Sequence, residues 1–305
     1  MEHSLPGTEG VPIYDILKFF RKELKNEDIM LRANSIAFSF FLSIFPAIIF
    51  LMSLLPYLPI ENFVETMKLS VLSIFPTDAA NFIIDTIESI TGVERGGVLS
   101  VSFIMALFFS SNGMISMMRG FDKSYEISYR TRSGLQKRGV AILMTVLIAS
   151  MLVVSVGLII FGQNLIDLLF EGTRLDAFSV RIFHLLRWMI IIALIYSGIG
   201  LIYHRGPALK RRLKFMSAGA SVATLLIILR SLGFSYFVNQ FGTYNKIYGS
   251  ISALIVILLV FQINSLILLI GYELNASIAI NRDIKAYREE QRSASPTEAG
   301  DIESG

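Results

Sequence analysis

The stretch ISALIVILLVFQINSLILLIGYEL (Ile251–Leu274) decides the fold, because it is long and apolar enough to cross a lipid bilayer as a helix. A spanning helix needs about 20 mostly apolar residues to cross about 30 Å of hydrocarbon. The sequence therefore predicts an all-α, polytopic membrane protein built as a bundle of six transmembrane helices. The other five predicted spans are Ser35–Leu58, Val98–Met118, Val140–Leu165, Phe183–Tyr203 and Phe215–Val238.

The loops between these spans carry their positive charge on every second side, and this bias sets the orientation of a membrane protein. The opposite loops hold few cations, namely Lys68, Arg95, Arg174, Arg181 and Lys246. Positive loops stay in the cytoplasm, so both termini are predicted to be cytoplasmic. The basic loops and ends contain Lys18, Arg21, Lys22, Lys25, Arg32, Arg119, Lys123, Arg130, Arg132, Lys137, Arg138, Arg205, Lys210, Arg211, Arg212, Lys214, Arg282, Lys285, Arg288 and Arg292.

The 305 residues, 53% of them hydrophobic, predict one membrane domain over residues 11–285. Residues 1–10 are expected to be a flexible N-terminus, and the polar residues 286–305 a disordered cytoplasmic tail. The formal net charge is only +3, and the basic residues lie at the predicted inner membrane boundaries. Both observations favour contact with membrane lipids over binding to nucleic acid. The chain has no cysteine, which excludes disulfides and thiolate chemistry.

Two amphipathic segments lie outside the spans. Ile13, Ile16, Leu17, Phe20 and Leu24 recur at helical spacing and predict an N-terminal amphipathic helix, either in the membrane interface or docked on the bundle. The segment Glu61–Glu94 predicts two short helices broken at Pro76, an amphipathic hairpin, either re-entrant or lying on the surface, that covers the outer end of the bundle.

The first span combines a proline with a face of serines. Pro46 removes a backbone hydrogen bond in mid-span, which predicts a kink near Ala47. Ser35, Ser39 and Ser43 are four residues apart and share one helix face. This face either packs closely against another helix or lines a polar cavity.

Polar side chains inside the spans are the candidates for function, because they are costly to place in lipid. Arg230 either faces a cavity, where it can bond Gln262 or Asn264, or anchors the outer interface. Glu273 is expected in the inner head-group region. The loop Asn239–Gly249 has the composition of a binding rim or of an interfacial turn. The candidate contacts with a cavity or substrate are Ser39, Ser43, Asn112, Arg230, Tyr244, Tyr248, Gln262, Asn264 and Glu273.

The sequence contains none of the common patterns of catalytic residues. Its histidines, His3, His184 and His204, lie in three separate regions, and no metalloprotease, hydrolase or phosphate-binding motif occurs. We therefore expect no catalytic site, no metal site and no cofactor.

Three stretches resemble the YihY/virulence factor BrkB family: ANSIAFSFFLSIFPAIIFLMSLLP (Ala33–Pro56), SSNGMISMMRGFDKSYEI (Ser110–Ile127) and FGTYNKIYGSISALIVILLVFQINSLILLIGYELNAS (Phe241–Ser277). The resemblance covers roughly residues 15–285 and implies a bacterial inner-membrane protein with six spans. The family once carried the name ribonuclease BN, for which this chain offers no catalytic group. The residues that match the family's motifs, without assigned roles, are Ser39, Pro46, Asn112, Tyr244, Tyr248, Gly249, Glu273 and Asn275.

Two functions fit these features. The first is a transporter of a lipid-like or amphipathic envelope molecule. The second is a non-transporting scaffold that organises envelope proteins. If Asn112, Gln262, Asn264 and Arg230 converge on one cavity, transport is favoured; if they are scattered or singly paired, a scaffold is favoured. The sequence leaves the oligomeric state open.

The predicted topology is tested with reporter fusions. Reporters fused after Lys137, after Arg212 and at the C-terminus should be active as cytoplasmic fusions. Reporters near Glu88, Asp176 and Lys246 should lie on the outer side. A cytoplasmic signal at Glu88 would contradict the six-span topology.

Overall fold

A computed structural model of the chain describes residues 28–54, 84–85, 96–122, 132–169, 177–209, 212–239 and 251–294, together with Tyr14, Lys18 and Arg21. These residues are almost entirely helical. The six helices are α2 (Asp28–Leu54), α5 (Gly96–Phe121), α6 (Gly134–Leu169), α7 (Ala177–Arg205), α8 (Ala218–Asn239) and α10 (Ile251–Ala294).

Each helix coincides with one predicted span, so the predicted fold class, an all-helical polytopic membrane protein, is confirmed. By length and composition, five helices can cross a membrane over their described residues: α2, α5, α6, α7 and α10. The sixth, α8, is apolar over Ala218–Phe234, which is shorter than a full span.

Several predicted features fall on residues outside the described parts of the chain. Of the N-terminal amphipathic helix, Tyr14, Lys18 and Arg21 are described, and they are helical. Of the outer hairpin, Ile84 and Asp85 are described, and they are helical too. Residues 240–250, most of the predicted loop before the sixth span, lie outside the described residues.

The predicted boundary of the C-terminal tail is wrong. Helix α10 continues to Ala294, so residues 286–294 are helical, although they were expected to be disordered. The polar sequence of this segment contains good helix formers such as Ala, Glu, Gln and Arg, and these extend a helix that already exists. Residues 295–305 lie outside the described part.

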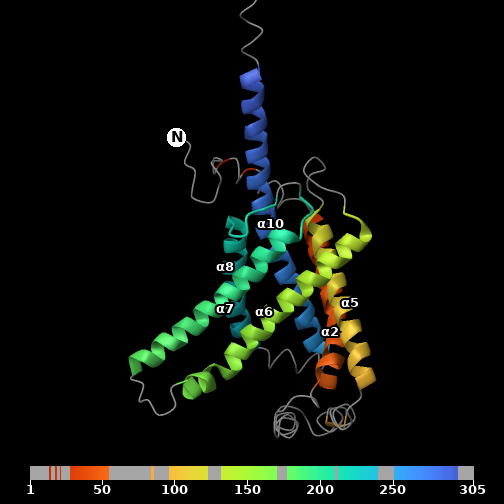
Figure 1. Cartoon of the computed structure of the whole chain (residues 1–305), viewed down its shortest axis with the longest axis vertical. Helices are drawn as coiled ribbons and strands as arrows, with labels where there is room; N and C mark the ends of the chain where they lie inside the picture. The colour runs from red at the N-terminus through yellow and green to blue at the C-terminus, as the bar shows by residue number, and fades with distance from the viewer. Residues whose placement is uncertain are drawn as a thin grey trace, which may run out of the picture.

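The helices converge at one end of the bundle and separate toward the other (Figure 1). Helices α2 and α5 pack along one another, as do α6 and α7, and the α6–α7 pair diverges from the α2–α5 pair. Helix α10 packs against α2 and α8 and extends past the point of convergence. We call the convergent end, where α5 and α7 finish and α6 and α8 begin, the inner end; it is the end predicted to face the cytoplasm.

The hydrophobic core lies at the inner end around three aromatic rings. Phe121 stacks on Tyr272 with ring centroids 4.3 Å apart, and Tyr203 meets both rings at 6.0 and 6.3 Å. All three side chains are fully buried. The Tyr203 hydroxyl donates to the carbonyl oxygen of Leu268 at 2.8 Å, which satisfies its polar group. This cluster joins α5, α7 and α10.

Local sequence fixes where α6 begins. The Ser133 hydroxyl accepts a hydrogen bond from the backbone N–H of Gln136, and the Gln136 side chain accepts one from the Ser133 N–H. This reciprocal pair is a capping box, which satisfies two donors that a helix start leaves open.

Helices α8 and α10 approach closely because two glycines face each other. A Cβ added at Gly271 would lie 2.7 Å from the carbonyl oxygen of Gly219 and 2.9 Å from the Cβ of Ala223. A Cβ added at Gly219 would lie 2.6 Å from the Asn275 Cγ. Small residues let membrane helices pack at short distance, so this contact sets the spacing of α8 and α10.

Two glycine substitutions in α8 should have opposite effects. Gly219→Ala should lower the free energy of unfolding by about 1–3 kcal/mol, because the added methyl group overlaps α10. Gly233→Ala is the matched control, since a Cβ there meets nothing within 4 Å. It should be neutral or stabilising by up to about 1 kcal/mol, from helix propensity. Thermal unfolding of the detergent-purified variants measures both effects; equal melting temperatures would contradict the close contact.

Candidate functional site: a polar cluster at the inner end

A buried ion pair joins α2 to α10 at the inner end. Nη1 of Arg32 donates to Oε1 of Glu273 at 2.8 Å and to the carbonyl oxygen of Gly120 on α5, also at 2.8 Å. The Glu273 side chain is 0% exposed and that of Arg32 is 11% exposed. Charges that are removed from solvent to this degree must be paired, because several kcal/mol of desolvation per ion would otherwise be uncompensated. One guanidinium thus connects three helices.

Glu273 thus lies at the inner end but inside the bundle, paired with Arg32, and its depth relative to the inner head groups stays a prediction. Its carboxylate is enclosed, and it neighbours the buried Tyr272 and Asn275 in the sequence GYELNAS. The sequence showed both charges but not their contact, because Arg32 counted only as one of the topology-setting cations. Arg32 is the partner that sequence reasoning missed.

Asn275, a residue of the same segment, caps the N-terminus of α8. Its Oδ1 accepts the backbone N–H of Gly219 at 2.8 Å, and its Nδ2 donates to the Ser217 hydroxyl at 2.9 Å. Ser217 precedes the first residue of α8, and its hydroxyl accepts the N–H of Ala220 at 3.3 Å. A helix start leaves its first N–H groups without intrahelical partners, and these two side chains accept two of them.

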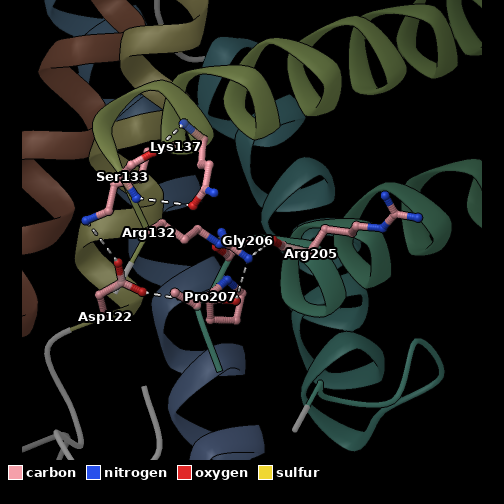
Figure 2. A network of polar contacts seen from close by, with 9 residues as sticks. Asp122, Arg132, Ser133, Lys137, Arg205, Gly206 and Pro207 are labelled. Carbon is pink, nitrogen blue, oxygen red and sulfur yellow. Dashed lines mark hydrogen bonds and ion pairs between the residues drawn. The ribbon is translucent and has the colours of Figure 1, made fainter. Parts of the chain in front are cut away.

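The C-terminal end of α7 is held by an arginine that precedes α6 (Figure 2). Arg132 donates to the carbonyl oxygens of Gly206 at 2.8 Å and of Arg205 and Pro207 at 3.2 Å. Carbonyl groups at the end of a helix lack intrahelical donors and carry partial negative charge, so a cation is favourable there. Arg132 therefore joins the start of α6 to the end of α7.

Asp122 connects α5 to the same region (Figure 2). Its Oδ1 accepts the backbone N–H of Ala208 at 3.2 Å, and its Oδ2 lies 3.9 Å from Nζ of Lys137 on α6. Together with Arg32–Glu273 and Asn275, these contacts make up what we call the inner polar cluster. The cluster joins all six described helices at one end of the bundle.

Of the predicted serine face of the first span, Ser39 contacts a neighbouring helix, whereas Ser35 is exposed. The Ser39 hydroxyl lies 2.8 Å from the Ser116 hydroxyl of α5, and the buried Ser43 donates to the carbonyl oxygen of Phe40 at 2.6 Å. Opposite them, a Cβ added at Gly113 would lie 2.7 Å from the Phe40 ring. This geometry is that of close helix packing, the first of the two interpretations.

Asn112 is paired with an arginine that the sequence had placed among the topology-setting cations. Its Oδ1 accepts from Nη1 of Arg138 on α6 at 2.7 Å, and the same nitrogen donates to the Ser111 hydroxyl at 2.9 Å. The Arg138 guanidinium carbon also lies 4.8 Å from the centroid of the Phe108 ring.

The remaining polar candidates are not bonded to one another. Gln262 donates to Oδ1 of Asn34 on α2 at 2.8 Å. The Arg230 guanidinium lies 5.3 Å from the Phe234 ring, and the hydrogen bond to Gln262 or Asn264 that a position facing a cavity would allow is not formed. Nε of Arg230 and Oδ1 of Asn264 are each buried without a hydrogen-bond partner.

Other predicted residues have simpler positions. Pro46 lies inside the continuous helix α2, and it lines an apolar pocket of about 300 Å³ between α2 and α5 with Ile49, Val98, Val101 and Met105. The kink at Pro46 stays a prediction. Tyr244 and Tyr248 lie outside the described residues. In the described part of the chain, histidines and acids form no group of three or more that could hold a metal.

The fold and the inner polar cluster define the class: a polytopic, all-helical membrane protein whose spans are joined at one end by buried polar contacts. The sequence profile of the Virulence factor BrkB family matches residues 20–297, so the chain belongs to this family.

Relatives of comparable length carry two kinds of name. YfkH of Bacillus subtilis, whose name describes it as ribonuclease-like, is 29% identical over 80% of this chain and 88% of its own length. UPF0761 membrane proteins of Vibrio campbellii and Aliivibrio fischeri are 26% and 24% identical, over 86% and 91% of this chain and 81% and 92% of theirs. No solved structure matches the chain.

Breaking the buried ion pair should be far more damaging than removing it entirely. Glu273→Gln leaves the Arg32 charge unpaired and should cost about 3–5 kcal/mol of unfolding free energy. The double variant Arg32→Met/Glu273→Met should recover most of this loss, because it leaves no charge to desolvate.

An exposed pair on the same helix provides the control. Asp283 lies 2.9 Å from Arg282 with its side chain 48% exposed, so Asp283→Asn should change stability by less than about 1 kcal/mol. Thermal unfolding in detergent compares the four proteins. A Glu273→Gln variant as stable as Asp283→Asn would show that the pair is not buried.

Proposed function

We propose that the protein is a transporter of lipid-like or amphipathic envelope molecules in the bacterial inner membrane, with both termini in the cytoplasm. The observation that supports this proposal is the difference between the two ends of the bundle. The inner end is joined by the inner polar cluster, whereas toward the other end α6 and α7 diverge from α2 and α5 (Figure 1).

The diverging helices expose large apolar side chains. On α6, Leu152 is 60% and Val153 66% exposed, and on α7 Leu185 is 60% and Trp188 53% exposed. In a membrane this surface is covered by acyl chains, since lipid is the solvent there. An amphipathic substrate could thus enter sideways from the bilayer, with its apolar part beside α6 and α7. This arrangement favours a lipid-like substrate over a hydrophilic one.

A carrier driven by protons or sodium ions usually has an acidic side chain within the membrane that binds the ion. Glu273 is the enclosed carboxylate of the described spans, and it is already paired with Arg32. In our proposal it therefore keeps the inner end closed and does not carry a coupling ion. Transport then requires this ion pair to separate or shift.

A non-transporting scaffold is the second candidate, and the criterion set by the four polar residues favours it over transport, because Asn112, Gln262, Asn264 and Arg230 are not bonded to one another. Asn112 and Gln262 are each bonded to one neighbouring helix, Asn112 to Arg138 and Gln262 to Asn34. Such singly paired amides hold helices together and line no common cavity. A scaffold that binds envelope proteins needs a rigid helix bundle but no internal cavity.

A nuclease function has little support, in spite of the name of YfkH. Hydrolysis of RNA needs a positioned acid and base or a metal site. The sequence has three histidines in separate regions, and the described residues contain no metal-binding group of acids and histidines. We infer that the protein is not an enzyme.

Transport can be tested with the full chain in liposomes. Phospholipid labelled with a fluorophore is placed in both leaflets, and a membrane-impermeant quencher reports its movement between them. A proton gradient of either sign is imposed in parallel samples. Wild-type protein should accelerate this movement over that in protein-free liposomes, and Arg32→Met/Glu273→Met should change the rate, because it removes the polar contact that closes the inner end.

The two candidate functions give different results. Movement equal to that in protein-free liposomes, under all gradients, would overturn the transporter and leave the scaffold. Faster movement that is the same in the double variant would support transport but exclude the ion pair as its gate.

A further inference from the structure

We propose that Arg138, with Ser111, Asn112 and Phe108, forms a binding site for the phosphate group of an anionic lipid between α5 and α6. The binding itself requires no transport. Only the identification of this lipid with the transported molecule rests on the proposed function.

The two bonds of Arg138 to the protein use one edge of its guanidinium. Both come from Nη1, to the Ser111 hydroxyl at 2.9 Å and to Oδ1 of Asn112 at 2.7 Å. A guanidinium has five N–H donors, so three remain on Nε and Nη2. These two nitrogens form the planar fork that matches a phosphate or carboxylate in bidentate fashion.

The protein holds this arginine in a fixed orientation. The Ser111 side chain is fully buried, and its hydroxyl donates to the carbonyl oxygen of Phe108 at 2.8 Å. The hydroxyl oxygen is thereby left to accept from Arg138. The Phe108 ring lies 4.8 Å from the guanidinium carbon and covers it by a cation–π contact. A pre-oriented donor loses less entropy when it binds a ligand.

Neither hydrogen-bond partner of Arg138 carries a charge. The ion pairs among the described residues are Arg32–Glu273, Lys137–Asp122 and Arg282–Asp283, and Arg138 is in none of them. Lys137, the preceding residue, is paired with Asp122. Arg138 therefore brings a positive charge without a counter-ion to the contact of α5 and α6.

The Arg138 side chain reaches from the first turns of α6 to the middle part of α5. Asn112 and Phe108 are nine and thirteen residues before the last residue of that helix, Phe121, which corresponds to about 13 and 20 Å along the axis. A cation between membrane-spanning helices usually faces a partner or a cavity. An anion at the free edge of Arg138 would supply that partner.

The free edge is accessible, in contrast to two other arginines of the spans. Nε of Arg187 and Nε of Arg230 are buried and have no hydrogen-bond partner. Arg138 is half-buried, and none of its nitrogens is both buried and without a hydrogen-bond partner. The Phe108 ring at the guanidinium is 50% exposed, and Met105, three residues before it on α5, is 46% exposed. The site thus offers donors to an anion and an apolar surface to acyl chains, which is the chemistry of an anionic phospholipid.

Lipid binding is measured by native mass spectrometry of the full chain purified in a neutral detergent. The probes are phosphatidylglycerol, phosphatidylcholine and inorganic phosphate. Wild-type protein should prefer phosphatidylglycerol, and Arg138→Gln should bind it about tenfold more weakly, because a charged hydrogen-bonded contact is lost. Arg138→Lys should recover binding only in part, since it keeps the charge but loses the planar fork.

The matched control is Arg119→Gln, which removes an exposed cation near the end of α5. It should bind phosphatidylglycerol as wild type does. Thermal unfolding of each variant separates a lost site from a lost fold, and Arg138→Lys tests the site if Arg138→Gln does not fold.

Each other outcome overturns a defined part of the proposal. Equal losses in Arg138→Gln and Arg119→Gln would show unspecific attraction, and full binding by Arg138→Gln would exclude the site. Equal binding of phosphatidylcholine would exclude selection for anionic lipid. If inorganic phosphate displaces phosphatidylglycerol at similar concentration, the ligand is free phosphate. Retained lipid binding without any transport would reject the proposed function and leave the site intact.

Discussion

The buried ion pair between Arg32 and Glu273 is the contact on which the arrangement of the helices depends. It joins α2 to α10, and through the carbonyl oxygen of Gly120 it also holds the end of α5. Helix packing in a membrane gains little from the hydrophobic effect, because lipid is as apolar as the helix surfaces. Orientation and spacing must then come from polar contacts and from small residues. The inner end supplies both: the ion pair at Glu273 and, two residues before and after it on the same helix, Gly271 and Asn275.

The segment GYELNAS of α10 shows how one short sequence serves several neighbours. Gly271 admits α8, Tyr272 stacks on Phe121 of α5, Glu273 binds Arg32 of α2, and Asn275 caps α8. Successive residues of a helix point in directions about 100° apart, so residues 271–275 face different neighbours. This explains why α10 lies at the centre of the inner end, and why its polar residues there are enclosed.

Much of the fold could be predicted from the sequence, because bilayer thickness fixes how long an apolar helix must be. The six helices follow the predicted spans for this reason. The polar contacts were harder to predict. Hydropathy gives the approximate depth of a residue but not which helices are neighbours, so Arg32 and Arg138 were counted as cations of the membrane boundary. The pairing of Glu273 with Arg32 was missed because the two residues lie 241 positions apart in the chain. The extension of α10 to Ala294 was missed because polarity was interpreted as disorder.

The difference between the two ends has a physical consequence for any movement of the bundle. At the inner end, separation of the helices would expose a buried carboxylate, a guanidinium and the cap of α8, each of which costs free energy unless new partners form. Toward the other end, α6 and α7 present apolar side chains that lipid already covers, so a change in their position exchanges one apolar contact for another. The helices can therefore move with little cost at the divergent end and only against a barrier at the inner end. By this argument the divergent end is the one that would move first, and Arg138, on the first turns of α6, would stay close to Asn112 while the rest of α6 moves.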